Sequence, residues 1–121
     1  MEINFSTLRM VVSNVEAAKD WFHSFTGLAP IEDSPNFVAF QLGTSTLEIL
    51  LADEKNPASF GGSIGYWMVK DLDKAIAKAE SLGAEVYRGP LYVSEINKTI
   101  CQISTPFGAN IGLEAKNDPF K

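Results

Sequence analysis

The chain has 121 residues, of which 45% are hydrophobic and 21% charged, and its formal net charge is −5 at pH 7. This mixture is typical of a globular domain and excludes a disordered or collagen-like chain. Because an acidic chain without a basic run is not attracted to phosphate backbones, we expect no nucleic-acid binding.

The chain has one histidine, His23, and one cysteine, Cys101. A metal site that needs two histidines or a cysteine cluster therefore cannot form within one chain. An internal disulfide is also impossible, as is usual in the cytoplasm. The N-terminal residues show no signal-peptide pattern, and no apolar run approaches the roughly 20 residues of a membrane span. We therefore expect a cytoplasmic protein that does not enter a membrane.

The first half of the chain predicts a strand, a helix and further strands. The strands are expected at residues 6–12, 36–42 and 46–51, the last two joined by a turn at Gly43. An amphipathic helix is expected over residues 14–25, closing near Gly27. Residues 53–62 are polar and rich in Pro and Gly, which is typical of a linker.

The second half predicts the same order. A helix is expected over residues 71–82, closing near Gly83. Strands are expected at residues 63–69, 85–88, 99–104 and 110–115, with a Pro- and Gly-containing turn at 105–108. Residues 64–69 are almost wholly apolar, which predicts a strand covered on both faces. Residues 87–98 are interpreted as a long loop.

The two predicted helices repeat each other. At one constant offset, four apolar positions of the first helix fall on four of the second: Val15, Ala18, Phe22 and Phe25 on Leu72, Ala75, Ala79 and Leu82. Asn14 and Asp71 precede these stripes, where a short polar side chain can cap a helix. Because one such module buries too little surface alone, we predict an α+β fold of two βαβββ modules, residues 1–52 and 63–121. Their curved sheets are expected to enclose a shared cleft, with the helices outside.

This pattern resembles the vicinal oxygen chelate superfamily, which includes glyoxalase I, extradiol dioxygenases and bleomycin-resistance proteins. The residues that carry the resemblance are 12–15 with 21–22 and 27–28, 47–50, 69–72 with 82–86, and the turn and strand at 105–111. The resemblance implies a homodimer. It also implies that the metal ligands of the family's enzymes correspond to Thr7, Glu48, Ile64 and Gly112. Only Glu48 among these is a suitable ligand, so we expect neither a metal ion nor another cofactor.

Side-chain alternation along the strands predicts which residues line the cleft, if the four matched positions face inward. The expected lining mixes apolar, aromatic and sparse polar groups, as small-molecule pockets do. The predicted ligand-binding residues are Arg9, Phe37, Gln41, Glu48, Leu50, Tyr66, Met68, Asn110 and Glu114. Tyr92 is added because it would overhang the mouth of the cleft from the loop. An Arg9–Glu48 ion pair that fills the space instead is an open alternative.

The first functional hypothesis is a metal-free protein, similar to the bleomycin-resistance branch, that sequesters a small organic molecule and has no catalytic residues. Acidic groups in an aromatic cleft suit a planar cationic guest. The alternative is an enzyme of glyoxalase or dioxygenase type, either metal-dependent or a metal-free lyase or isomerase that uses Glu48 as base. A third hypothesis is an interaction domain without a ligand. We interpret His23 as a helical residue with a local hydrogen bond, and Cys101 as a small buried hydrophobe.

Overall fold

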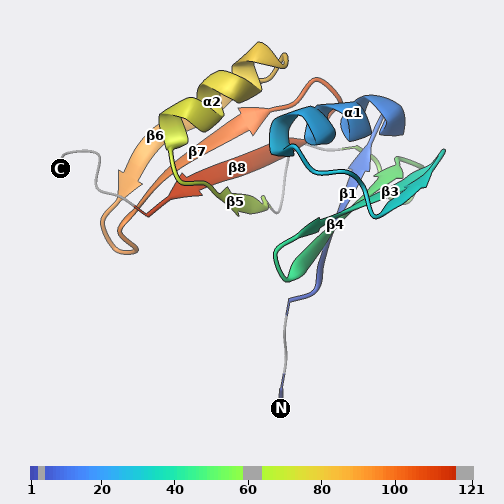
Figure 1. Ribbon diagram of the computed structural model, residues 1–121, viewed down its shortest axis with the longest axis horizontal. Coiled ribbons are helices and arrows are strands. Elements are labelled where there is room, and N and C mark those ends of the chain that lie inside the picture. The colour runs from blue at the N-terminus through green and yellow to red at the C-terminus, as the bar shows by residue number, and fades with distance from the viewer. Residues whose placement is uncertain (3–4, 59–63, 117–121) are drawn as a thin grey trace. The chain divides into compact units, whose positions relative to one another are not determined.

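The computed structural model describes residues 1–2, 5–58 and 64–116 (Figure 1). The chain divides into two compact units, Met1–Ser59 and Phe60–Lys121. The predicted linker, residues 53–62, spans this division, and its residues 59–62 lie outside the described residues. Its beginning is a turn in which the Asp53 carboxylate accepts a hydrogen bond from the Asn56 backbone N–H at 2.8 Å.

The first unit has one helix and a four-stranded sheet. Its elements are β1 (Thr7–Val12), α1 (Val15–Thr26), β2 (Glu32–Ser34), β3 (Phe37–Leu42) and β4 (Ser45–Leu51). The strand order is β1-β4-β3-β2, with β1 and β4 parallel and the other pairs antiparallel. The sequence did not predict β2. Its three residues are polar and exposed, so they show no apolar alternation, and the strand exists through its pairing with β3.

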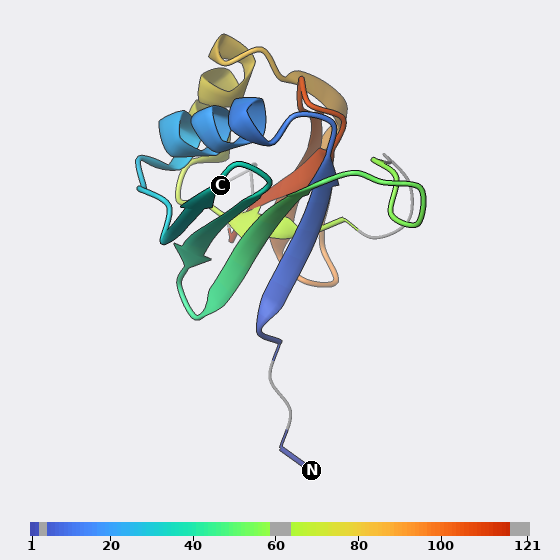
Figure 2. The same cartoon turned by 90° about the vertical axis from the view of Figure 1, so that its right-hand side faces the viewer.

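The second unit repeats this topology. Its elements are β5 (Tyr66–Met68), α2 (Leu72–Ser81), β6 (Glu85–Val93), β7 (Lys98–Ser104) and β8 (Asn110–Ala115). The strand order is β5-β8-β7-β6, and the β5–β8 pair is parallel, as β1–β4 is in the first unit. Figure 2 turns the view, so that the first sheet and its helix can be followed from another side. The predicted α+β fold with two similar modules is therefore confirmed.

Two expectations for the second unit are wrong. The strand expected at 63–69 is reduced to Tyr66–Met68 among the described residues, and Met68 is 47% exposed rather than covered on both faces. Met68 lies on the face of the sheet away from α2, and β5 is the edge strand beside β8 in the sheet that the structure describes. The loop expected at 87–98 is mostly strand, because β6 continues to Val93 and pairs with β7 through two register shifts.

Both helices begin at the predicted caps. The Asn14 side chain accepts a hydrogen bond from the Ala17 backbone N–H at 3.0 Å, and Asp71 accepts one from Lys74 at 3.1 Å. The helix faces also follow the prediction closely: Val15, Ala18 and Phe22 are buried in α1, and Leu72 and Ala79 in α2. In α2 the buried stripe includes Ile76, while Ala75 is half-buried.

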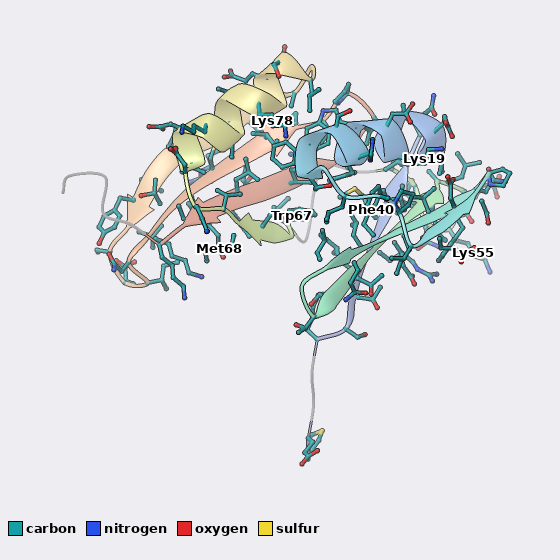
Figure 3. The ribbon with its side chains drawn as sticks, in the orientation of Figure 1. Lys19, Phe40, Lys55, Trp67, Met68 and Lys78 are labelled. Carbon is teal, nitrogen blue, oxygen red and sulfur yellow. The ribbon has the colours of Figure 1, made fainter. Side chains whose placement is uncertain are left out.

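The core of the first unit lies between α1 and its sheet. Phe40 is fully buried and lies between β3 and α1 (Figure 3). Its ring centroid is 6.3 Å from that of Phe22, and the Phe22 ring meets Trp21 edge-on at 5.0 Å. Each sheet thus has one face against its own helix, and the opposite face remains for other contacts.

Candidate functional site

The face of each sheet that is turned away from its helix carries most of the predicted site residues, and we call it the distal face. On β4, Leu47 and Ile49 are buried under α1, whereas Thr46, Glu48 and Leu50 alternate with them and lie on the distal face. On β8, Ile111 and Leu113 are the corresponding fully buried residues. The residues between them therefore lie on the distal face of the second sheet.

The strand registers divide the predicted site residues between the two units. Five lie together on the distal face of the first sheet: Arg9, Phe37, Gln41, Glu48 and Leu50. Four lie together on the distal face of the second sheet: Tyr66, Met68, Asn110 and Glu114. Figure 3 shows Met68 on the side of its sheet away from α2.

Tyr92 does not join either group. It pairs with Thr99 of β7, which is buried and lies on the same side of the sheet as Cys101, the side that α2 covers. Its hydroxyl donates a hydrogen bond to the Asn97 side chain at 2.7 Å, within the β6–β7 hairpin. Tyr92 therefore lies on a strand, residues 85–93, and not on the expected loop.

The polar groups on the first distal face bond to one another. Arg9 donates to Glu48 Oε1 from Nη2 at 2.8 Å and from Nε at 3.0 Å. The Arg9 side chain is 62% exposed and that of Glu48 22%, so this is a surface pair, which contributes at most about 1 kcal/mol. Gln41 donates to the Gly43 carbonyl at 2.8 Å and accepts from Thr46 at 3.3 Å. The Arg9–Glu48 contact of the open alternative is therefore present, but as an exposed pair and not as the buried, space-filling pair of that alternative.

On the second distal face a row of four residues crosses all four strands. Tyr66 on β5 pairs with Gly112 on β8, Gly112 with Gln102 on β7, and Gln102 with Arg88 on β6. Gly112 has no side chain, and the Tyr66 ring lies over it: a Cβ at residue 112 would be 2.3 Å from the ring. The ring reaches Gln102, whose Nε2 donates to the Tyr66 hydroxyl at 3.0 Å.

A cavity of about 170 Å³ lies beside this row. Its lining residues all belong to the second unit: Tyr66, Arg88, Gly89, Leu91, Ile100, Cys101 and Gln102. Gly89 closes one side with φ +95°, and a Cβ there would be 2.9 Å from the Ile100 carbonyl oxygen, so only glycine fits. Of the lining residues, the sequence predicted only Tyr66. Ile100 and Gln102 could have been found by extending the alternation argument to the strand expected at 99–104.

The remaining predicted residues of this face lie around the cavity rather than in its lining. Glu114 is held by Lys98, whose Nζ lies 3.2 Å from Oε1. Asn110 is only 7% exposed, and its side-chain nitrogen and oxygen have no hydrogen-bond partner among the described residues. Buried side-chain amides without hydrogen bonds are uncommon and costly. Asn110 is therefore a buried polar group whose hydrogen-bond donor and acceptor lack partners among the described residues.

The residues present do not fit the metal ion that the fold family suggests. Among the described residues, no three His, Cys, Asp or Glu side chains lie close enough together to hold an ion. Of the four matched positions, Glu48 is engaged by Arg9. At Gly112, the volume that a ligating side chain would need is filled by the Tyr66 ring. Thr7 and Ile64 supply no anionic donor.

His23 and Cys101 have local explanations. His23 Nδ1 lies 2.8 Å from the Leu28 carbonyl, and because a carbonyl only accepts, Nδ1 donates. The Cys101 side chain is 1% exposed. Burial, with a smaller contribution from the charge of Glu80, raises the pKa of the Cys101 thiol above its ordinary value of 9.0.

The raised pKa of Cys101 predicts a pH effect. Well below pH 9 the thiol is protonated in both the folded and the unfolded chain. As the pH rises further, the unfolded chain loses this proton first, so the free energy of unfolding falls until the folded thiol also ionises. Urea titrations from pH 7 to 10 should therefore show a steeper loss of stability for the wild type than for Cys101→Ala. Equal slopes for the two proteins would contradict this environment for the thiol.

Comparisons with known proteins agree with this fold. The family model described as the Glyoxalase/Bleomycin resistance protein/Dioxygenase superfamily matches residues 4–113. The chain therefore belongs to this superfamily, as the resemblance to the vicinal oxygen chelate proteins implied. No curated protein sequence matches the chain. Within the described residues, no helix has the length and apolar character to cross a membrane.

Solved structures with the same fold have low sequence identity. One is TnmS3, an antibiotic binding protein from Streptomyces sp. CB03234, with 21% identity, TM-score 0.75 and coverage of 94% of this chain and 96% of that one. A glyoxalase/bleomycin resistance protein/dioxygenase family enzyme from Burkholderia phytofirmans PsJN has 15% identity, TM-score 0.79 and coverage of 93% and 98%. Protein ATC0852 from Agrobacterium tumefaciens has 19% identity, TM-score 0.78 and coverage of 94% and 98%. At these identities the similarity establishes the fold alone.

Proposed function

We propose that this chain is a small-molecule binding protein that holds an organic ligand without a metal ion, on the distal face of the second sheet. The observation that carries the proposal is the cavity between β5, β6 and β7, which combines apolar walls with a few polar groups. The cavity lies next to Gly112, the position that matches a metal ligand of the family's enzymes. There the Tyr66 ring occupies the space that a ligating side chain would need, and it forms part of the cavity wall.

The family comparison supports binding as a function. TnmS3, a structure of the same fold, is an antibiotic binding protein. By extension, we propose that the present chain sequesters its ligand and has a role in antibiotic resistance. We further propose that it is a cytoplasmic homodimer whose modules share a cleft. Light scattering of the purified chain tests the dimer separately, and a monomeric mass would remove that part of the proposal.

The enzyme alternative has less support from the site. In a lyase or isomerase that used Glu48 as base, this carboxylate would have to be available beside a bound substrate. Its Oε1 instead accepts both hydrogen bonds from Arg9, and Glu48 is not among the residues that line the cavity. Conversion of a bound compound by the metal-free chain would nevertheless favour this alternative over simple binding.

The proposal is tested by ligand-observed NMR on the full chain in the presence of EDTA. The panel holds single-ring compounds that are anionic, neutral or cationic. We expect at least one compound to bind saturably and to be recovered unchanged. Leu91→Trp, which places an indole at the cavity wall, should abolish this binding. Ile96→Trp is the matched control, because Ile96 is similarly exposed, 53% against 51% for Leu91, but lies in the hairpin turn.

Three results would overturn the proposed function. One is that no compound of any charge binds. Another is that binding requires an added divalent ion. The third is that Leu91→Trp binds as well as the wild type, which would place the ligand elsewhere on the chain.

A further inference from the structure

We infer that the cavity of the second unit takes an anionic group, and that its ligand is a small carboxylate carrying a single ring or a short branched chain. This inference rests on the proposed function and names the ligand class. The acidic residues alone would suggest a cationic ligand, whereas this inference assigns an anionic one. Glu48 and Glu114 do not oppose it, because each already forms an ion pair with a basic side chain, at 2.8 Å and 3.2 Å.

The polar side chains of the cavity are mainly hydrogen-bond donors. Gln102 already donates one N–H to the Tyr66 hydroxyl oxygen at 3.0 Å, which leaves the hydroxyl hydrogen and the second amide hydrogen to donate elsewhere. Arg88 adds a guanidinium, which has five N–H donors and no acceptor. The Gln102 carbonyl oxygen is the main side-chain acceptor opposite these donors. A carboxylate, which only accepts, complements this set.

Arg88 is also the charged residue of the cavity. It lies at the end of the row that Tyr66, Gly112 and Gln102 form, and it takes part in no ion pair with another described residue. Glu114 belongs to the next row, opposite Ile100, and is paired with Lys98. A guanidinium without a protein carboxylate can form a bidentate pair with the carboxylate of a ligand.

The size and apolar walls of the cavity limit the rest of the ligand. Its volume of about 170 Å³ is close to that of the roughly 150 Å³ cavity that accommodates benzene in an engineered protein core. Leu91 and Ile100 supply aliphatic wall. One ring or a short branched chain fills this space, and a larger molecule would insert only its carboxylate-bearing end.

The experiment compares three probes of nearly equal shape and different charge: benzoate, benzamide and benzylamine. Their dissociation constants are measured with the full chain by NMR titration in EDTA at constant ionic strength. We expect benzoate to bind about tenfold more tightly than benzamide, the difference that a charge-assisted pair supplies, and benzylamine to bind most weakly. Because the chain carries a net charge of −5, non-specific attraction predicts the opposite order.

The variants assign the preference to one side chain. Arg88→Gln should remove the advantage of benzoate over benzamide, and Arg88→Lys should restore part of it. Lys78→Gln is the matched control, because it removes one positive charge from an exposed position on α2 (Figure 3) and should keep the full advantage. Arg88 is exposed, so its variants are expected to fold.

The outcomes separate this inference from the proposed function. If benzamide and benzoate bind equally to the wild type, or if Arg88→Gln keeps the preference for benzoate, the inference fails while small-molecule binding stands. Tightest binding of benzylamine would also overturn it, in favour of a cationic guest. If none of the three probes binds but other compounds of the panel do, the ligand class is wrong. If nothing binds, the proposed function itself fails.

Discussion

Gly112→Ala is expected to abolish ligand binding in the cavity and to reduce the free energy of unfolding by about 1–3 kcal/mol, as overpacking does. The new methyl group would lie 2.3 Å from the Tyr66 ring, far inside van der Waals contact. The ring would have to swing off the sheet, and its hydrogen bond with Gln102 would break. Calorimetric titration and urea unfolding measure the two effects.

The control for this prediction is the double variant Tyr66→Ala/Gly112→Ala. The three atoms nearest to the added methyl group all belong to this ring, so the cost of Gly112→Ala should largely disappear in the Tyr66→Ala background. Residues in direct contact show such coupling, whereas independent sites do not. An unchanged cost in that background, or wild-type binding by Gly112→Ala, would contradict the position of Tyr66 over Gly112.

Phe22→Ala should lower the stability of the first unit by about 3–5 kcal/mol, which is the usual cost of removing a buried phenylalanine. Phe22 is 1% exposed and packs against the rings of Trp21 and Phe40. Unfolding is best followed by Trp21 fluorescence in a Trp67→Phe background, because Trp67 belongs to the other unit.

Tyr87→Ala supplies the comparison for Phe22→Ala. Tyr87 is also aromatic but is 62% exposed, and surface substitutions usually change stability by no more than about 0.5 kcal/mol. If Phe22→Ala costs as little as Tyr87→Ala, the packing of α1 on its sheet is not as described. If both cost several kcal/mol, exposure is a poor guide to the contribution of these rings.

The sequence predicted the fold well because its signals are local and repeated. The constant offset between the apolar positions of the two helices predicted the two modules. Both helix caps, Asn14 and Asp71, lie where they were expected. Alternation also placed Glu48 and Leu50 on the face opposite Leu47. It failed for β2, whose stability comes from pairing with β3 rather than from apolar alternation.

The site was harder to predict because its contacts depend on register and rotamer. The two register shifts in β6 interrupt the alternation, so the face on which Arg88 and Leu91 lie cannot be counted from the sequence. The Lys98–Glu114 pair joins neighbouring strands, and the Tyr66 ring covers Gly112 by its side-chain orientation. The acidic residues suggested a cationic guest. The Arg9–Glu48 pair was an alternative already open from the sequence, whereas the Lys98–Glu114 pair becomes evident only in three dimensions.

The most direct test of a metal-free ligand site in the second unit is a chemical-shift titration of the ¹⁵N-labelled chain in EDTA, with the tightest-binding compound of the panel. The account predicts that the largest shifts occur at the backbone amides of Tyr66, Gly89, Leu91 and residues 100–102, which surround the cavity. Shifts concentrated around Arg9 and Glu48, or shifts that occur only after a divalent ion is added, would contradict it.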